Sequence, residues 1–357
     1  MLNKRRASST TNPNVKAQLV AFTATVMNKI GLCSAYGFLR SRLVGSQSVI
    51  IAYHRIGGVS DYPWSLTPTT PRDFEKEIGY LRERYVFASL EEVVTSLQAS
   101  KTIPPRTAVI TFDDGYKDVY LNAYPVLKKN SIPATVFLST DYIDTRNLFW
   151  WDIVGYVIWQ TKLNSLDFGG LGTYRLGSAQ NRIRAIGHFQ EKLKSLADEK
   201  RREAIDTLVR TCDVAIPPDI GNEHILSWDE IREMGRNGIS FGAHTATHPI
   251  LTRMPLENAR QEIIASKQRI ETELGQEVVT FCYPNGEIGD LNRAIEEILE
   301  KDGFKCAVIV EPFAFLSGNV SRFRLPRISV DSNYDLFTLV MSGLYLDLVQ
   351  HRRREER

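Results

Sequence analysis

Short apolar runs alternate with segments of helical periodicity along most of the chain. The apolar runs end in polar or turn residues, as buried strands do, and the segments between them repeat apolar side chains at helical intervals. Repeated strand–helix units predict a parallel sheet with right-handed crossovers, and periodicity alone leaves a closed barrel and an open sheet equally open. The predicted strands are 48–53, 86–90, 107–112, 134–139, 239–243, 278–283, 306–310 and 323–330. The predicted helices are 74–81, one that opens at 90–92, 118–129, 228–236, 256–274, 291–301 and 334–346.

The alternation breaks between residues 143 and 225. An aromatic helix is predicted over 148–159, and a Gly- and Ser-rich segment and a charged helical stretch, 182–210, follow it. We therefore expect a mainly helical insertion or lid, whose large aromatic side chains fix it to the rest of the domain by packing. The predicted organisation is an N-terminal tail and helix (1–47), a main α/β domain (48–142 and 226–346), the insertion (143–225) and a charged tail (347–357).

Residues 17–43 predict a basic amphipathic helix. Such a helix suits a membrane surface or a partner's groove, and a helix packed on the protein's own body is an equal alternative. The apolar stretch is too short and too polar to span a bilayer, and it makes a poor secretory signal. The apolar side of this predicted helix comprises Leu19, Phe22, Val26, Ile30, Phe38 and Leu39.

Composition and charge narrow the function classes. The 357 residues carry a formal net charge of +2, which argues against a nucleic-acid partner by bulk electrostatics. The four cysteines include no C-x-x-C pair, so they indicate neither a zinc knuckle nor a disulfide framework. Cys282 and Cys306 lie in apolar runs and are expected to be small core residues.

Chemically active side chains directly follow the predicted strands. Asp113 and Asp114 end one apolar run and precede Gly115, a pattern that by itself also fits an ordinary Asp-Gly turn. His244 and His248 follow another run with H-x-x-x-H spacing. Two imidazoles and one carboxylate make a facial set of three metal ligands with open positions for water and substrate. Side chains placed just after strands are typical of an active site at the C-terminal face of a β/α barrel.

The two motifs together, TFDDGY and then H-T-x-T-H-P, resemble those of the polysaccharide deacetylases, the NodB-homology carbohydrate esterases of family 4. The resemblance covers roughly residues 48–331. It implies a distorted (β/α)7 barrel with Asp114, His244 and His248 around a divalent metal, most simply zinc. Asp113 matches the family's general base, and Thr245 and Thr247 lie where a hydroxyl braces the histidine loop.

A third stretch, Tyr283-Pro284-Asn285-Gly286, stands where the family has Arg-x-Pro-Tyr/Phe-Gly. The resemblance implies that the Asn285 backbone N–H helps to hold the oxyanion, with Tyr283, Pro284, Gly286 and Tyr116 beside the substrate. Phe281 occupies the place of the family's arginine, so the cation that orients the base must come from elsewhere. Arg327 is the first candidate and Arg324 the second, against the alternative of ordinary surface arginines.

The general acid also departs from the common pattern. The family's late Leu-x-His motif is absent, because the only histidine after His248 is His351 in the charged tail. His54 follows the first strand in a Tyr-His context that resembles the branch acting on poly-N-acetylglucosamine exopolysaccharides. We therefore assign His54 as general acid, with a structural histidine at a strand end as the alternative.

The resemblance implies a metal-dependent hydrolase that removes N-acetyl groups from N-acetylglucosamine-containing polysaccharide or oligosaccharide. An O-acetyl esterase or deformylase acting on a sugar or lipid-linked sugar fits the same motifs. A non-catalytic carbohydrate-binding protein is a third possibility, which the intact Asp and His motifs disfavour. The N-terminal segment favours a cytoplasmic or membrane-peripheral location over the envelope.

Overall fold

The computed structural model describes residues 13–45, 47–58, 63–64, 69–99, 103–311, 315–316, 321–329 and 333–348. Its contacts divide the chain into two compact units. One is Gln47–Asp331, and the other combines Met1–Ser46 with Ser332–Arg357. We describe each unit by itself.

The core of the larger unit is a closed parallel barrel. Within the described residues, seven strands form a ring, because β1 pairs with both β3 and β10, and the short β2 (Val86–Phe87) adds to the start of β3. This confirms the (β/α)7 barrel. In ring order the strands are β1 (Val49–Tyr53), β3 (Thr107–Phe112), β4 (Ala134–Leu138), β7 (Ile239–Ala243), β8 (Thr280–Cys282), β9 (Cys306–Val310) and β10 (Leu325–Ser329).

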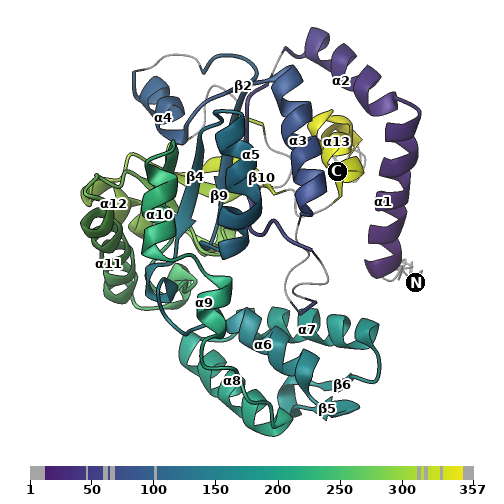
Figure 1. Cartoon of the computed structure of the whole chain (residues 1–357), viewed down its shortest axis with the longest axis vertical. Helices are drawn as coiled ribbons and strands as arrows, with labels where there is room; N and C mark the ends of the chain where they lie inside the picture. The colour runs from purple at the N-terminus through teal and green to yellow at the C-terminus, as the bar shows by residue number, and fades with distance from the viewer. Residues whose placement is uncertain are drawn as a thin grey trace, which may run out of the picture. The chain divides into compact units, whose positions relative to one another are not determined.

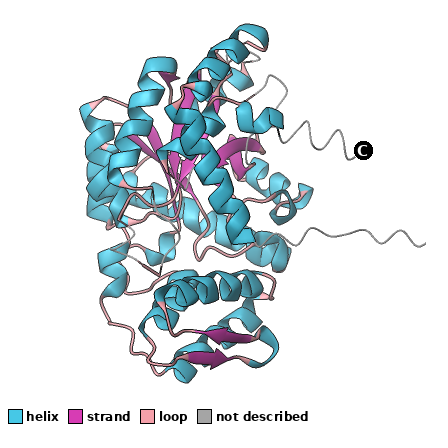
Figure 2. Cartoon of the chain, turned by 90° about the vertical axis from the view of Figure 1, so that its right-hand side faces the viewer, coloured by secondary structure: helices cyan, strands magenta, loops and turns pink. Residues whose placement is uncertain are grey.

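Helices cover the outside of the barrel, and the strands lie inside them (Figure 2). Every residue of β1, β3 and β4 is buried, as expected for parallel strands covered on both faces. Ser89 and Ser227 begin two of these helices with complete capping boxes. The covering helices are α3 (Pro71–Arg84), α4 (Leu90–Gln98), α5 (Tyr124–Lys129), α10 (Trp228–Gly235), α11 (Leu256–Leu274) and α12 (Arg293–Lys301).

The segment between β4 and β7 is mainly helical and has its own apolar core, which includes Val154, Phe189 and Leu208 (Figure 1, lower part). Its Gly-rich stretch forms an unpredicted hairpin, because the glycines at 169 and 172 adopt positive φ and allow a tight turn. The charged stretch 182–210 is helical as predicted, and it divides between two helices. The elements are α6 (Trp150–Gln160), β5 (Ser165–Asp167), β6 (Thr173–Arg175), α7 (Ala179–Lys194), α8 (Asp198–Cys212) and α9 (Ile220–His224).

The smaller unit, called the helical unit below, contains α1 (Pro13–Lys29), α2 (Leu32–Leu43) and α13 (Tyr334–Met341). The single helix predicted over 17–43 is wrong, because Gly31 takes a left-handed conformation (φ 74°) and separates α1 from α2. The helix predicted over 334–346 belongs to this unit and not to the barrel domain. Most of the predicted tail 347–357 lies outside the described residues. Of the helices that the structure describes, none is long and apolar enough to cross a membrane.

Candidate active site

A cavity of about 430 Å³ opens where the barrel strands end. The loops that follow the strands contribute polar side chains to its wall, which places the site at the C-terminal face of the barrel, as predicted. The intervening helical segment supplies the rest of the wall. The barrel contributes His54, Asp113, Asp114, His244, His248, Tyr283 and Asn285, and the helical segment contributes Trp150, Trp151, His188, Gln190, Glu191, Lys194 and Arg201.

Asp114, His244 and His248 converge, as the sequence predicts. The two Nε2 atoms lie 3.1 Å apart, and Oδ1 of Asp114 lies 3.5 Å from His244 Nε2 and 3.3 Å from His248 Nε2. Four ligands held about 2.0–2.2 Å from a tetrahedral zinc ion are themselves about 3.3–3.6 Å apart, so this spacing suits a divalent ion. Oδ1 of Asp114 is also buried with no hydrogen-bond partner among the described residues, as expected of an oxygen reserved for a cation.

The backbone that carries these three ligands is unusual. Asp114 (φ 72°) and His248 (φ 58°) both adopt left-handed conformations that non-glycine residues rarely take. The histidine loop is held by the Thr245 hydroxyl, which accepts a hydrogen bond from the His248 backbone N–H at 3.0 Å. Thr247 is bound through its backbone N–H and its hydroxyl to Glu262. These hydrogen bonds stabilise a loop conformation that would otherwise be strained.

The orientation of His244 is fixed from behind. Its Nδ1 lies 2.8 Å from the carbonyl oxygen of Cys282, so Nδ1 donates and Nε2 is left to face Asp114. The Ser139 hydroxyl donates to the His244 carbonyl oxygen at 3.1 Å. Partners of this kind set the tautomer that a metal ligand needs.

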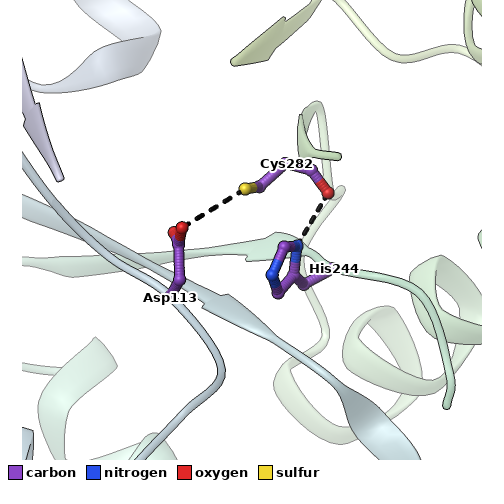
Figure 3. A group of neighbouring side chains, drawn as sticks. All are labelled: Asp113, His244 and Cys282. Atoms are coloured by element: carbon purple, nitrogen blue, oxygen red, sulfur yellow. Dashed lines mark hydrogen bonds between the residues drawn. The ribbon is translucent and has the colours of Figure 1, made fainter. Parts of the chain in front are cut away.

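Asp113 lies close to His244 and Cys282 (Figure 3), and its environment differs from that of Asp114. Arg327 donates two hydrogen bonds to its carboxylate, from Nη1 to Oδ1 at 2.6 Å and from Nη2 to Oδ2 at 2.7 Å. Burial raises the pKa of Asp113, but the charge and hydrogen bonds of Arg327 outweigh it, so the pKa lies below its ordinary value. Of the two predicted arginines, Arg327 therefore reaches the site, whereas Arg324 is half-exposed and pairs with Glu296.

Cys282 contributes a thiol that the sequence analysis assigned only to the core. It is fully buried, and its Sγ lies 3.1 Å from Arg327 Nη2 and 3.6 Å from Asp113 Oδ2. Burial raises the pKa of this thiol, which favours the protonated form. Asp113, His244 and Cys282 could in principle hold a metal ion. Because Arg327 already occupies both oxygens of Asp113, the Asp114 set suits a cation better. The position of Cys282 at a strand end was the available signal.

His54 lies on the cavity wall, with Nε2 3.8 Å from Oδ2 of Asp113. Its side chain is 23% exposed, so the imidazole can reach a molecule in the cavity. Asn285 adopts a left-handed conformation (φ 63°), and its side chain is bound by Asp290. No described residue accepts a hydrogen bond from the Asn285 backbone N–H. Both residues line the cavity, and their catalytic roles stay predictions.

Of the other predicted substrate contacts, only some lie on the cavity wall. Tyr283 lines the cavity, whereas Pro284 and Gly286 do not belong to its wall. Gly286 has φ 70°, and an added Cβ would lie 3.2 Å from the backbone nitrogen of Val310, so the position requires glycine for the chain path. The prediction for Tyr116 is also corrected.

Tyr116 is fully buried behind the wall. Its hydroxyl donates to Asp152 and accepts from the indole N–H of Trp151. Trp151 in turn packs edge-on against His248, with ring centroids 4.6 Å apart. The sequence did not identify Trp151 as a site residue, although the aromatic run at 148–151 was a signal. The intervening segment therefore packs directly on a candidate metal ligand.

Comparisons with known proteins agree with this architecture. The family model described as polysaccharide deacetylase matches residues 100–307. The poly-beta-1,6-N-acetyl-D-glucosamine N-deacetylase of Staphylococcus epidermidis is 27% identical over 48% of this chain and 60% of its own length. The protein of the same name from Staphylococcus aureus strain MSSA476 is 37% identical over 23% of this chain and 28% of its own length. This chain spans less than two thirds of the length of the curated relatives that it matches.

Two solved structures share the fold. The deacetylase PplD of Streptococcus pyogenes has a TM-score of 0.55 at 20% identity, over 83% of this chain and 98% of that one. IcaB from Ammonifex degensii has a TM-score of 0.53 at 18% identity, over 84% of this chain and 97% of that one. The family model covers more than half of the chain and includes Asp113, Asp114, His244 and His248. The protein belongs to the polysaccharide deacetylase family.

Proposed function

We propose that this protein is a divalent-metal-dependent hydrolase that removes N-acetyl groups from an N-acetylglucosamine-containing polysaccharide or oligosaccharide. The observation that carries the proposal is the convergence of Asp114 Oδ1 with the Nε2 atoms of His244 and His248, directly beside the carboxylate of Asp113. Asp114, His244 and His248 would hold the ion, for which zinc is the best candidate. When bound, such an ion supplies Lewis-acid activation of the acetyl carbonyl and of water.

The other site residues each have a separate role in the proposed reaction. Asp113 is ionised at neutral pH because its pKa is lowered, so it can take a proton from the attacking water. Arg327 holds the carboxylate in place through both oxygens. The Asn285 backbone N–H is available to donate to the oxyanion. As the carbon–nitrogen bond breaks, His54 donates a proton to the leaving amine, which gives acetate and a free amino sugar.

The substrate class rests on the relatives and on the shape of the site. The staphylococcal proteins are named for poly-beta-1,6-N-acetyl-D-glucosamine, and we extend that polymer class to this chain. A cavity walled by tryptophans and polar side chains suits a sugar ring, which presents both apolar faces and hydroxyls. An O-acetyl ester would fit the same catalytic groups, so the experiment includes it.

The test measures metal content and acetate release on the full chain. Purified protein is assayed with chitooligosaccharides, poly-β-1,6-N-acetylglucosamine oligomers and O-acetylated sugars, before and after chelation and with zinc restored. We expect acetate from the N-acetylated substrates, loss on chelation and recovery with zinc. Undiminished release from the chelated protein would refute the metal dependence. Release from O-acetylated sugars alone would make the protein an esterase, and metal binding without any hydrolysis would make it a carbohydrate-binding protein.

A further inference from the structure

The helical unit joins its helices partly through hydrogen bonds between half-buried polar side chains, and it carries large apolar side chains on its exposed surface. Its internal contacts are made by hydrogen bonds to two acids, Asp335 and Asp347, and by a small cluster that includes Ala24 and Cys33. The cluster also contains Leu339, and Met27 of α1 packs against it, so both polar and apolar residues join α1 and α2 to the C-terminal segment. The hydrogen bonds are Thr25 Oγ1 to Asp335 Oδ2 and Asn28 Nδ2 to Asp335 Oδ1, both 2.7 Å, and Tyr36 OH and Arg40 Nε to Asp347 Oδ2 at 2.7 and 2.8 Å.

The outward side of the same helices is apolar. Phe22, Val26 and Ile30 recur every four residues, so they share one face of α1. Phe22 is 68% exposed and Ile30 69% exposed, and Leu43 on α2 reaches 83%. Several large apolar side chains exposed on two neighbouring helices mark an interaction site. We call this set the apolar face, and it comprises Phe22, Val26, Ile30, Leu32, Phe38, Leu39, Leu43 and Val44.

Every charged residue in the N-terminal part of the helical unit is basic. Residues 1–46 contain no Asp or Glu. Lys29 is exposed at the end of α1, and the guanidinium of Arg42 lies 5.1 Å from the ring centroid of Phe38. A cation whose stem runs along apolar surface can keep its head in the polar layer of a bilayer. The basic residues of the segment are Lys4, Arg5, Arg6, Lys16, Lys29, Arg40 and Arg42.

We propose that the apolar face of the helical unit docks on an anionic lipid surface and lies in the interface of the bilayer. Apolar side chains bordered by cations match anionic headgroups above an acyl layer. A symmetric dimer through the same face would bring Lys29 and Arg42 of the two copies near one another, which like-charge repulsion opposes. The break at Gly31 gives two short helices, and this arrangement suits lying on a surface rather than crossing it.

The test is co-sedimentation of the full chain with lipid vesicles. Wild-type protein is expected to bind phosphatidylcholine–phosphatidylglycerol vesicles and to bind pure phosphatidylcholine much more weakly. The double variant Phe22→Ser/Ile30→Ser should lower the partition coefficient by about tenfold or more, because it removes two large apolar anchors. Replacing Lys29 and Arg42 by Glu should lower it by at least about fivefold for each charge removed, and high salt should do the same.

The matched control is Val86→Ser/Leu256→Ser, which removes two exposed apolar side chains from the barrel unit. It should bind vesicles as the wild type does. Equal binding by the Phe22→Ser/Ile30→Ser variant would overturn the proposal. A second result would also overturn it: light scattering shows that the wild type is a dimer and binds no vesicles, whereas the Phe22→Ser/Ile30→Ser variant is a monomer. A monomeric wild type that binds no vesicles would show that the face has another occupant and would also overturn it.

Discussion

The barrel rim and the helical unit distribute polar and apolar side chains in opposite ways. At the rim, Asp113, Asp114 and Arg327 are at most 2% exposed, whereas in the helical unit Phe22 and Leu43 are mostly exposed. Burying charge and exposing large apolar side chains both work against stability. Each region therefore keeps an unfavourable arrangement that the fold alone does not require, and we place catalysis in one and surface binding in the other.

The largest effect is expected from Asp114→Asn, which weakens one of three ligands without changing side-chain shape. If the rim buries its charges for a cation, this variant should retain no metal and lose activity by at least about 10³-fold. Metal analysis and acetate release on the same preparation check it. Asp206→Asn, an exposed acid on α8, is the matched control and should behave as the wild type. Metal retained at full occupancy in Asp114→Asn would break the comparison.

Arg327→Met tests the buried ion pair between Arg327 and Asp113 at the rim. It leaves Asp113 as a buried carboxylate without its cation, which typically costs about 3–5 kcal/mol of unfolding free energy. The double variant Asp113→Asn/Arg327→Met removes both charges and should recover part of that loss. Because the pKa of Asp113 is lowered, the pair stabilises the fold above the ordinary carboxyl pKa and loses this effect as pH falls. Denaturant unfolding that finds single and double variants equally unstable would contradict this.

A buried imidazole outside the ligand set gives a pH test. Burial, with the charge of Arg55 second, lowers the pKa of His224 from 6.5 to about 4. Between these values the unfolded chain binds a proton that the folded chain excludes, so stability falls as pH decreases through this window. His224→Gln lacks this change, and the wild type should lose at most about 3 kcal/mol more than the variant, less with solvent screening. Parallel pH profiles would disprove the assignment.

A smaller loss of stability is expected when the half-buried polar contacts of the helical unit are removed. Asp335→Ala removes the acceptor of Thr25 and Asn28, and the loss should be about 1–3 kcal/mol. Hydrogen exchange of the α1 amides should then accelerate by about tenfold or more, because the hydrogen bonds that tie α1 to α13 are lost. Asp206→Ala serves again as an exposed control. Unchanged exchange in α1 would mean that the polar contacts do not stabilise this unit.

The smallest change in unfolding free energy is expected from a substitution on the apolar face. Phe22→Ala should change the unfolding free energy by less than about 0.5 kcal/mol, since an exposed side chain loses little contact. Leu339→Ala, a buried residue of the same unit, should cost about 2–5 kcal/mol. The pair is measured by denaturant unfolding. A large loss for Phe22→Ala would mean that this face packs within the folded protein, and the contrast with the rim would fail.

The sequence revealed those parts of the site that are encoded locally. Asp113, Asp114, His244 and His248 lie in short motifs at the ends of apolar runs, and the parallel strand pattern brings such ends to one face. Arg327 was the first of two candidates, because the resemblance puts Phe281 where the family has its arginine, and the structure places Arg327 on Asp113. The order of strands and helices could also be predicted, because the periodicity of each segment is a local feature of the sequence.

Features that depend on tertiary contacts were not predictable. The Tyr116 hydroxyl is satisfied by Asp152 and Trp151, both from a segment without strand–helix rhythm, so its burial could not be inferred. Trp151 reaches His248 only because that segment folds against the rim. The break at Gly31 depends on one left-handed residue in an otherwise helical pattern. These are choices of backbone conformation and packing that residue type alone does not determine.

The most direct test of the metal site is X-ray absorption at the zinc edge of the zinc-loaded full chain, together with zinc stoichiometry. The account predicts one ion per chain with only nitrogen and oxygen neighbours, two of them imidazoles, and loss of the ion in His248→Ala. A sulfur neighbour at about 2.3 Å would instead place the ion on Cys282 with Asp113 and His244. That result, or a chain that retains no zinc, would contradict the central claim.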